Sequence, residues 1–384
     1  MAVLALAFAI ASGCDENETP PSTPTTPTET TSAPTPSPAP TPNPPTPGPS
    51  PAPTPGPSPA PTPDPPATPK PDPPSTPKPP APPAPPPAPP SLVRLNEHLG
   101  LLFPSSNWWN RDIRNAPGDP DSDRFIDFVG RSRRLHPDFG PPPYGMPYVT
   151  VGSGQPRVPV AFVSYGSESD TEFRGVPGYP IPDEAKTRPN FIEGGVPGGG
   201  SSGDRHLLIV DRDQWVLYEL YATRWNSSAG RWEAGSGAIF DLNRNDRRPE
   251  GWTSADAAGL AILSGLVRYD EVAGSGDIPH AFRVTVRATD DYVWPASHRA
   301  GSTNGALPMG ARLRLKASKD ISGFPSDMQR IFRAMKTYGL IVADNGSDMY
   351  ITGTMDSRWD NDQLNPAFAA LTAGDFDVVE LGWH

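Results

Sequence analysis

The stretch Trp215-Val-Leu-Tyr-Glu-Leu-Tyr-Ala222 indicates the fold of this 384-residue chain. Every residue in it is apolar or aromatic except Glu219. Side chains alternate between the two faces of an extended strand, so Glu219 shares a face with its neighbours at positions 215, 217 and 221. We therefore expect a strand here, with one carboxyl group among aromatic side chains.

Similar short runs recur through residues 91–384, and helical patterns are fewer. Residues 326–338 carry the clearest helical stripe, and shorter helices are expected at residues 123–129, 253–263 and 361–371. The pattern favours a mainly β fold, a β-sandwich or jelly-roll-like domain with a few peripheral helices. The expected strands are residues 158–163, 206–210, 215–222, 236–242, 282–288, 312–317, 340–343, 349–352 and 376–381.

Proline divides the chain into parts. Residues 20–90 hold 36 of its 57 prolines, together with many Thr, Ser and Ala residues. Such a segment has little apolar surface to bury and few backbone donors, so we expect a disordered tether rich in polyproline II. Residues 91–384 have ordinary composition and are long enough to form a globular domain with its own core.

The N-terminal segment has the features of an export signal. Residues 2–11 are apolar, which is too short a run to span a bilayer. Ala11-Ser12-Gly13-Cys14 resembles the lipobox of bacterial lipoproteins, in which the cysteine is lipidated. This resemblance implies a signal peptide at residues 1–13, a lipidated mature N-terminus at residues 14–19, and a lipid-anchored protein of the cell envelope facing the periplasm or the extracellular space. The alternative is an unused cysteine after a coincidental apolar run.

Charge and cysteine content exclude several classes of protein. Of the formal net charge of −11, −4 falls on residues 1–90, which leaves −7 for residues 91–384. A nucleic-acid partner is not expected, because phosphate backbones require a dense basic surface. The single cysteine excludes an intramolecular disulfide and a cysteine zinc cluster.

Residues 91–384 also resemble an uncharacterised family of secreted bacterial proteins, and the resemblance implies no particular reaction. It rests on six stretches: Asn107-Trp-Trp-Asn-Arg-Asp-Ile113, Leu135-His-Pro-Asp-Phe-Gly140, Ser202-Gly-Asp-Arg-His206, Gly251-Trp-Thr-Ser-Ala-Asp-Ala-Ala-Gly259, Val293-Trp-Pro-Ala-Ser-His298 and Ala343-Asp-Asn-Gly-Ser347.

Paired carboxylates are the simplest machinery for glycoside hydrolysis, with one as proton donor and the other as nucleophile or base. We expect Glu219 to act with Asp241 or Asp204. The alternative for Glu219 is an outward-facing strand residue among amphipathic neighbours, and a turn-starting Asp explains Asp241 equally well. The expected helpers at strand ends are His206, His280 and His298. No histidine pair has the spacing of a zinc site.

The expected partner is a polysaccharide or cell-wall glycan. All nine tryptophans lie in residues 91–384, and indole rings stack on sugars as well as in cores. The expected substrate-binding residues are Trp215, Trp225, Trp252, Trp294 and Arg283. A glycan hydrolase is the preferred hypothesis, and a non-catalytic glycan- or protein-binding module of the envelope is the alternative.

Two other hypotheses rest on fewer residues. A polysaccharide lyase would use Lys316, or Arg283 with Tyr292, to act on an acidic sugar. Asp119, Asp121 and Asp123 offer oxygen ligands for calcium, although acids at the start of a helix explain the same run. No other cofactor or metal is expected.

The lipid anchor gives a first prediction. Cys14→Ser removes the sulfur to which the lipid would be attached, so we expect the full chain to move from the membrane to the released fraction on cell fractionation. Ser12→Ala, which keeps a small residue before the cysteine, should remain with the membrane. Unchanged membrane association of Cys14→Ser would refute the anchor.

Overall fold

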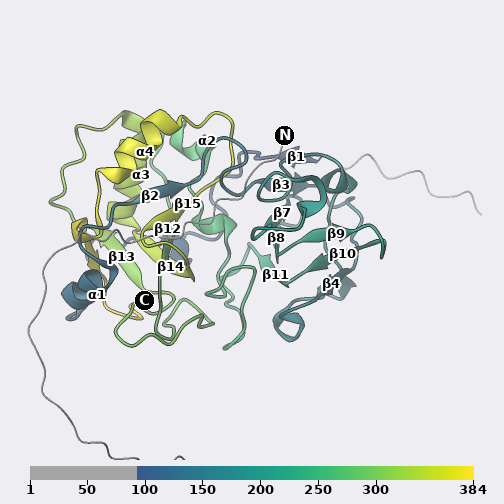
Figure 1. Cartoon of the computed structure of the whole chain (residues 1–384), viewed down its shortest axis with the longest axis horizontal. Helices are drawn as coiled ribbons and strands as arrows, with labels where there is room; N and C mark the ends of the chain where they lie inside the picture. Colours follow the sequence, from purple (N-terminus) through teal and green to yellow (C-terminus); the bar gives the residue numbers. More distant parts are fainter. Residues whose placement is uncertain (1–92) are drawn as a thin grey trace, which may run out of the picture. The chain divides into compact units, whose positions relative to one another are not determined.

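The computed structural model describes residues 93–384. The expected signal peptide, the lipidated segment with Cys14 and the tether at residues 20–90 therefore lie outside the described residues. Within residues 93–384 strands outnumber helices, which confirms the β-rich domain. Two larger sheets lie side by side in Figure 1.

The stretch at residues 215–222 forms β8 (Val216–Tyr221), near one edge of the five-stranded sheet. β8 pairs antiparallel with β7 and β11, whereas β3 and β7 are parallel. The order across this sheet is β1 (Arg94–Leu95), β3 (Tyr148–Val151), β7 (Leu207–Asp211), β8 and β11 (Ser236–Asp241).

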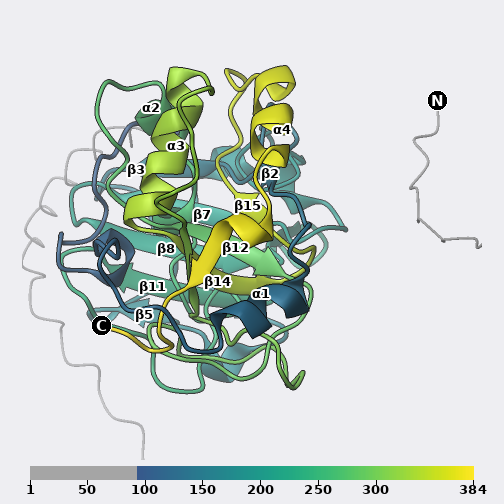
Figure 2. The ribbon, with the colours of Figure 1, turned by 90° about the vertical axis from the view of Figure 1, so that its left-hand side faces the viewer.

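The six-stranded sheet is also mixed, because β12–β14 and β15–β2 are parallel pairs. Figure 2 shows helices α3 and α4 standing side by side in front of this sheet. The strand order is β16 (Phe376–Val378), β13 (Arg312–Leu315), β14 (Leu340–Asn345), β12 (Phe282–Val286), β15 (Tyr350–Thr352) and β2 (His136–Asp138). The sandwich or jelly-roll arrangement stays a prediction.

The helices confirm three of the four sequence-based expectations. They are α1 (Ser122–Val129), α2 (Tyr269–Val272), α3 (Ser326–Thr337) and α4 (Asn361–Ala369). Among the described residues, none of them has the length and apolar composition that a membrane crossing requires.

Smaller elements surround the two sheets. A three-stranded sheet joins β4 (Val160–Phe162), β10 (Arg231–Ala234) and β9 (Arg224–Asn226), and a hairpin joins β5 (Glu172–Phe173) and β6 (Val176–Pro177). The 3₁₀ turns are η1 (Trp108–Asn110), η2 (Gly166–Glu168), η3 (Asp183–Lys186), η4 (Pro197–Gly199), η5 (Leu263–Gly265) and η6 (Ala373–Asp375).

Both faces of the five-stranded sheet are buried. On one face, Val216, Tyr218 and Leu220 of β8 pack with a cluster that includes Tyr179 and Phe191. These last two residues belong to the irregular stretch 167–203, which therefore covers this face of the sheet. On the other face, residues such as Leu217 belong to a continuous core shared with the six-stranded sheet.

An irregular segment, residues 253–268, lies buried between the two sheets. A buried loop must find partners for its backbone groups, because water does not reach them. The Ala258 N–H donates to the Ala343 carbonyl of β14 at 3.0 Å, and the Val267 N–H donates to the Thr352 carbonyl of β15 at 3.1 Å. These two hydrogen bonds therefore attach the segment to strands β14 and β15 of the six-stranded sheet.

The helix expected at residues 253–263 is wrong. Gly259 has φ +73°, which interrupts a helix. The backbone groups of this segment bond to neighbouring strands and side chains: the Asp256 N–H, for example, donates to Ser254 Oγ at 2.8 Å. The Thr253-to-Asp256 spacing thus forms a compact turn instead of a helix start, with Thr253 Oγ1 donating to the Asp256 carbonyl.

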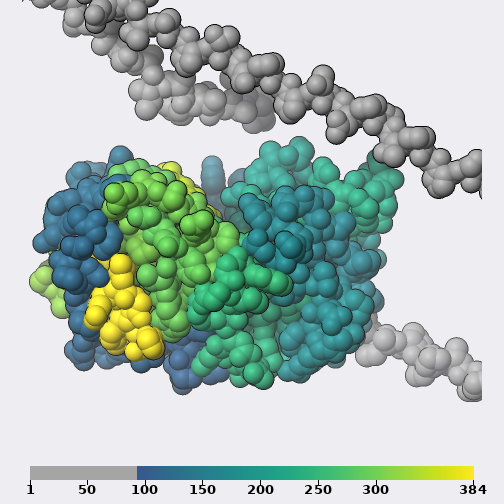
Figure 3. Space-filling view, turned by 90° about the horizontal axis from the view of Figure 1, so that it is seen from below, coloured from purple at the N-terminus to yellow at the C-terminus, as the bar shows by residue number. Residues whose placement is uncertain are grey.

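The end of the chain packs against the first part of the domain. Figure 3 shows the last residues, in yellow, beside the blue N-terminal part of the domain. The Glu380 N–H donates to the Pro117 carbonyl at 2.9 Å, and the Arg111 guanidinium lies 5.1 Å from the ring centre of Trp383. The two ends of the described domain thus stabilise each other.

Gly259 gives a test of this packing. A Cβ at Gly259 would clash with Ser297 Oγ and approach the Trp252 carbonyl oxygen to 2.7 Å, whereas a Cβ at Gly251 meets nothing within 4 Å. Both glycines have positive φ, so Gly251→Ala should cost about 1 kcal/mol of unfolding free energy. Gly259→Ala should cost about 3 kcal/mol, because overpacking adds to the same strain. Equal losses in urea unfolding would contradict the buried contact.

Candidate functional site

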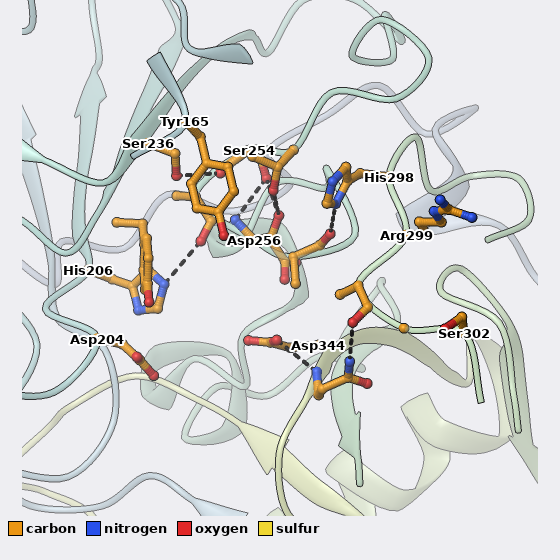
Figure 4. A pocket seen from close by; sticks show the side chains of 17 residues that line it. Tyr165, Asp204, His206, Ser236, Ser254, Asp256, His298, Arg299, Ser302 and Asp344 are labelled. Carbon is orange, nitrogen blue, oxygen red and sulfur yellow. Dashed lines mark hydrogen bonds between the residues drawn. The ribbon is translucent and has the colours of Figure 1, made fainter. Parts of the chain in front are cut away.

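A polar cavity of about 570 Å³ lies between the two sheets, beside the buried segment 253–268. Figure 4 shows its side chains converging from stretches far apart in the sequence. Its walls are Tyr165, Asp204, His206, Tyr221, Ser236, residues 253–257, residues 298–302 and residues 344–345. The cavity includes three of the residues expected from the sequence, Asp204, His206 and His298.

Asp344 is the carboxyl group in the cavity with the most perturbed environment. It lies near the C-terminal end of β14 with its side chain one-third exposed. Its pKa is raised to about 6, first by burial and then by the neighbouring Asp256 carboxylate. Arg283, whose Nη2 is 3.9 Å from Asp344 Oδ2, opposes this shift only in part. Near neutral pH this carboxyl group can therefore both hold and release a proton.

Asp256 and Arg283 form a buried ion pair beside the cavity. Arg283 donates from Nη2 to Asp256 Oδ1 at 2.8 Å and from Nε to Oδ2 at 3.1 Å. Its Nη1 donates to Thr352 Oγ1 at 2.9 Å. The Asp256 side chain is fully buried, and Arg283 is 2% exposed. Arg283 is therefore paired with Asp256. It does not line the cavity, whereas a substrate-binding residue would.

His206 is held as a cation. Its Nδ1 lies 2.7 Å from Glu193 Oε2 and its Nε2 lies 3.1 Å from the Ala255 carbonyl oxygen. Both partners are acceptors, so both ring nitrogens donate. Burial favours the neutral ring, but the Glu193 carboxylate outweighs it and raises the His206 pKa to about 9. The ring cannot accept a proton near neutral pH, so it fixes the wall at Ala255.

His298 has the opposite character. Its Nδ1 is 2.8 Å from the Ala257 carbonyl oxygen, which can only accept, so Nδ1 carries the proton. Its Nε2 has no hydrogen-bond partner among residues 93–384, and the His298 side chain lines the cavity (Figure 4). His298 Nε2 can therefore accept a hydrogen bond from a bound molecule.

Asp204 offers an unpaired carboxylate. Its side chain is exposed at the cavity and has no ion pair or hydrogen bond with any other part of the described domain. Figure 4 shows Asp204 and Asp344 on the same side of the cavity. The site therefore combines one carboxyl group of raised pKa with a second carboxylate exposed to solvent.

Glu219 does not reach this cavity. It is fully buried, and its oxygens accept from the Ile262 and Leu263 N–H groups, each at 2.9 Å. Burial raises its pKa to about 7, against the effect of these two donors. The carboxyl group satisfies two backbone donors of the buried segment 253–268, which is a structural task.

Asp241 and His280 also lie outside the cavity. Asp241 ends β11, where Arg174 donates to its Oδ2 at 2.7 Å. His280 is buried, with Nε2 3.0 Å from Glu271 Oε2. The three strand-end histidines are therefore not brought together: His206 and His298 meet at the cavity, and His280 stays in a separate buried ion-pair group.

The expected tryptophan lining is replaced by tyrosines. Tyr165 and Tyr221 supply the aromatic rings of the cavity. The tryptophans have other contacts: Trp215 Nε1 donates to the Leu102 carbonyl, Trp225 packs on Trp232, Trp252 lies under Arg248, and Trp294 lies between Trp108 and His384.

The residues of the lyase hypothesis are scattered. Lys316 Nζ donates to the Gly374 carbonyl at 2.8 Å, and Tyr292 Oη bonds to Glu250 at 3.0 Å. Neither lines the cavity, and Arg283 is paired with Asp256. The residues of the lyase hypothesis therefore do not come together at one site.

The acidic run at Asp119, Asp121 and Asp123 is divided among different partners. Asp119 accepts from the backbone N–H groups of residues 121 and 381, Asp121 pairs with Arg124, and Asp123 pairs with Arg131. In the described part of the chain, no group of three or more His, Cys, Asp or Glu side chains is arranged to hold a metal ion.

Sequence reasoning missed Asp344, Tyr165 and Arg299. Asp344 directly follows the expected strand at residues 340–343, which was the available signal. Tyr165 and Arg299 lie in loops, and no local pattern marks them. Comparison of the chain with protein-family models, curated proteins and solved structures gives no match.

The His206–Glu193 pair predicts a pH dependence of stability. A histidine whose pKa is raised from 6.5 to about 9 on folding contributes stability that is complete below about pH 6.5 and lost as the pH rises through about 9. The pKa of Glu193 is lowered on folding, so this residue contributes stability above its ordinary titration range, and that stability is lost as the pH falls. His206→Gln should therefore flatten the decline in unfolding free energy between pH 6.5 and 9. Exposed His136→Gln is the control, and parallel curves for His206→Gln and the natural chain would refute the buried cation.

Proposed function

We propose that residues 91–384 form a glycan hydrolase whose reaction centre is the cavity containing Asp344 and Asp204. The observation that carries the proposal is a carboxyl group with its pKa raised to about 6, in a cavity that presents a second, unpaired carboxylate. A carboxyl group of raised pKa and a second, unpaired carboxylate in one cavity match the division between proton donor and nucleophile or base. For the scaffold we retain the proposal of a sandwich-like β domain.

In this mechanism Asp344 replaces Glu219 as the proton donor. The protonated Asp344 gives its proton to the oxygen of the glycosidic bond as that bond breaks. The Asp204 carboxylate stabilises positive charge on the sugar ring and acts as nucleophile or as base toward water. Tyr165 and Tyr221 provide ring faces for the apolar side of a sugar, and His298 Nε2 accepts from a hydroxyl group.

The location proposed for this activity is the cell envelope. Cys14 would carry a lipid, and the Pro-rich residues 20–90 would hold the domain away from the membrane. At about 3.1 Å per residue, an extended tether of this length reaches on the order of 200 Å. This reach suits a substrate that forms a layer, such as a cell-wall glycan.

The experiment is a panel of polysaccharides assayed separately for binding and for reducing-end release. With a cleaved member, Asp344→Asn should lower kcat by about 10²- to 10⁴-fold, the usual contribution of a general acid. The natural chain should lose activity as the pH rises through about 6, because Asp344 must be protonated. The residual activity of Asp344→Asn should lack this loss.

Asp246→Asn is the matched control, since Asp246 is 65% exposed and lies outside the cavity. Full activity of Asp344→Asn would overturn the assignment of the proton donor. Binding without release of reducing ends would support the non-catalytic module instead, and an unsaturated product would show elimination.

A further inference from the structure

Arg299 is a cation without a partner at the rim of the cavity. It is exposed and lines the cavity beside His298. It makes no ion pair or hydrogen bond with any residue of the described domain. The other arginines near the site differ: Arg283 is paired with Asp256, and Arg248 with Asp170.

The backbone that carries Arg299 is fixed. His298 Nδ1 bonds to the Ala257 carbonyl at 2.8 Å on one side. On the other side, Asn345 Nδ2 donates to the Ala300 carbonyl at 3.0 Å, and the Asp291 N–H donates to the Gly301 carbonyl at 3.2 Å. The side chain of Arg299 therefore extends from an ordered rim, which lowers the entropic cost of binding a ligand there.

Charge is separated along the cavity. Figure 4 shows Asp204 at one end, Arg299 and Ser302 at the other, and Asp344 between them. The positive charge of His206 is already neutralised by Glu193. A bound molecule thus meets the exposed Asp204 carboxylate at one end, Asp344 between the ends, and an unpaired guanidinium beside His298 at the other end.

We propose that the end of the cavity formed by His298, Arg299 and Ser302 is a subsite for the anionic group of an acidic glycan. The anionic group is a sugar carboxylate or an ester sulfate, either of which a guanidinium binds through two charge-assisted hydrogen bonds. This inference names the substrate class of the proposed hydrolase and rests on that proposal for its place in a reaction.

The charge of the surroundings limits where such a glycan can bind. Residues 91–384 carry a net charge of −7, so most of the surface disfavours a polyanion. An anionic sugar is disfavoured beside Asp204 and Asp344 and favoured beside Arg299. The subsite would therefore fix which sugar unit lies at the carboxyl pair and which lies at the rim.

The test measures binding of the full chain to matched probes by calorimetry. The probes are tetragalacturonate with its methyl ester, and a sulfated galactan tetrasaccharide with its desulfated form. Asp344→Asn is the background, which slows turnover during the measurement. At least one acidic probe should bind about tenfold or more tightly than its neutral partner, and the pair that differs identifies carboxylate or sulfate as the group.

Arg299→Gln should remove this preference and its dependence on salt, while Arg299→Lys should keep part of it. Arg244→Gln is the matched control, because Arg244 is also exposed and lies outside the cavity. Absence of any preference for an acidic probe, including absence of all binding, overturns the subsite, as does a preference that survives Arg299→Gln.

The outcomes separate this inference from the hydrolase proposal. A preference that depends on Arg299, with no cleavage of any glycan by the natural chain, keeps the subsite and rejects the hydrolase. Cleavage that depends on Asp344, with equal affinity for acidic and neutral probes, keeps the hydrolase and rejects the subsite.

Discussion

The structure depends on satisfying the backbone of residues 253–268, an irregular segment buried between two sheets. Each unpaired N–H or carbonyl there would cost about 1 to 3 kcal/mol. Glu219 supplies acceptors for two N–H groups from the five-stranded sheet, and β14 and β15 supply carbonyl groups from the six-stranded sheet. The Asp256–Arg283 ion pair adds a charged link to β12. The segment therefore joins the sheets through specific polar contacts, and apolar packing surrounds them.

The same segment sets the chemistry of the cavity. Burial raises the pKa of Asp344, and Asp256, which Arg283 fixes close to it, raises this pKa as well. His206 bonds to the Ala255 carbonyl and His298 to the Ala257 carbonyl, which places both rings against one short stretch of backbone. The first ring is a cation with both nitrogens occupied, and the second keeps a free acceptor. The Glu193 carboxylate, which pairs with His206 alone, thus gives two histidines of one cavity different roles.

The sequence was sufficient where structure follows from local pattern. β8, β11 and β14 appear where alternation placed them, because a side chain's face in a strand depends only on its position. The role of Glu219 was not accessible in this way, since its partners lie more than forty residues further along the chain. Asp344 and Asp241 look alike as strand-end acids. Only the spatial neighbours, Asp256 for one and Arg174 for the other, distinguish them.

The irregular stretch 167–203 has a consequence for the domain as a unit. Through Tyr179 and Phe191 it covers the alternate residues Val216, Tyr218 and Leu220 of β8. A shortened chain without this cover would present a flat apolar stripe of high β-propensity, the kind of surface on which copies of a chain associate. The stretch therefore acts as a permanent shield against self-association, and the smallest autonomous form of this domain must retain it although it contributes few regular elements.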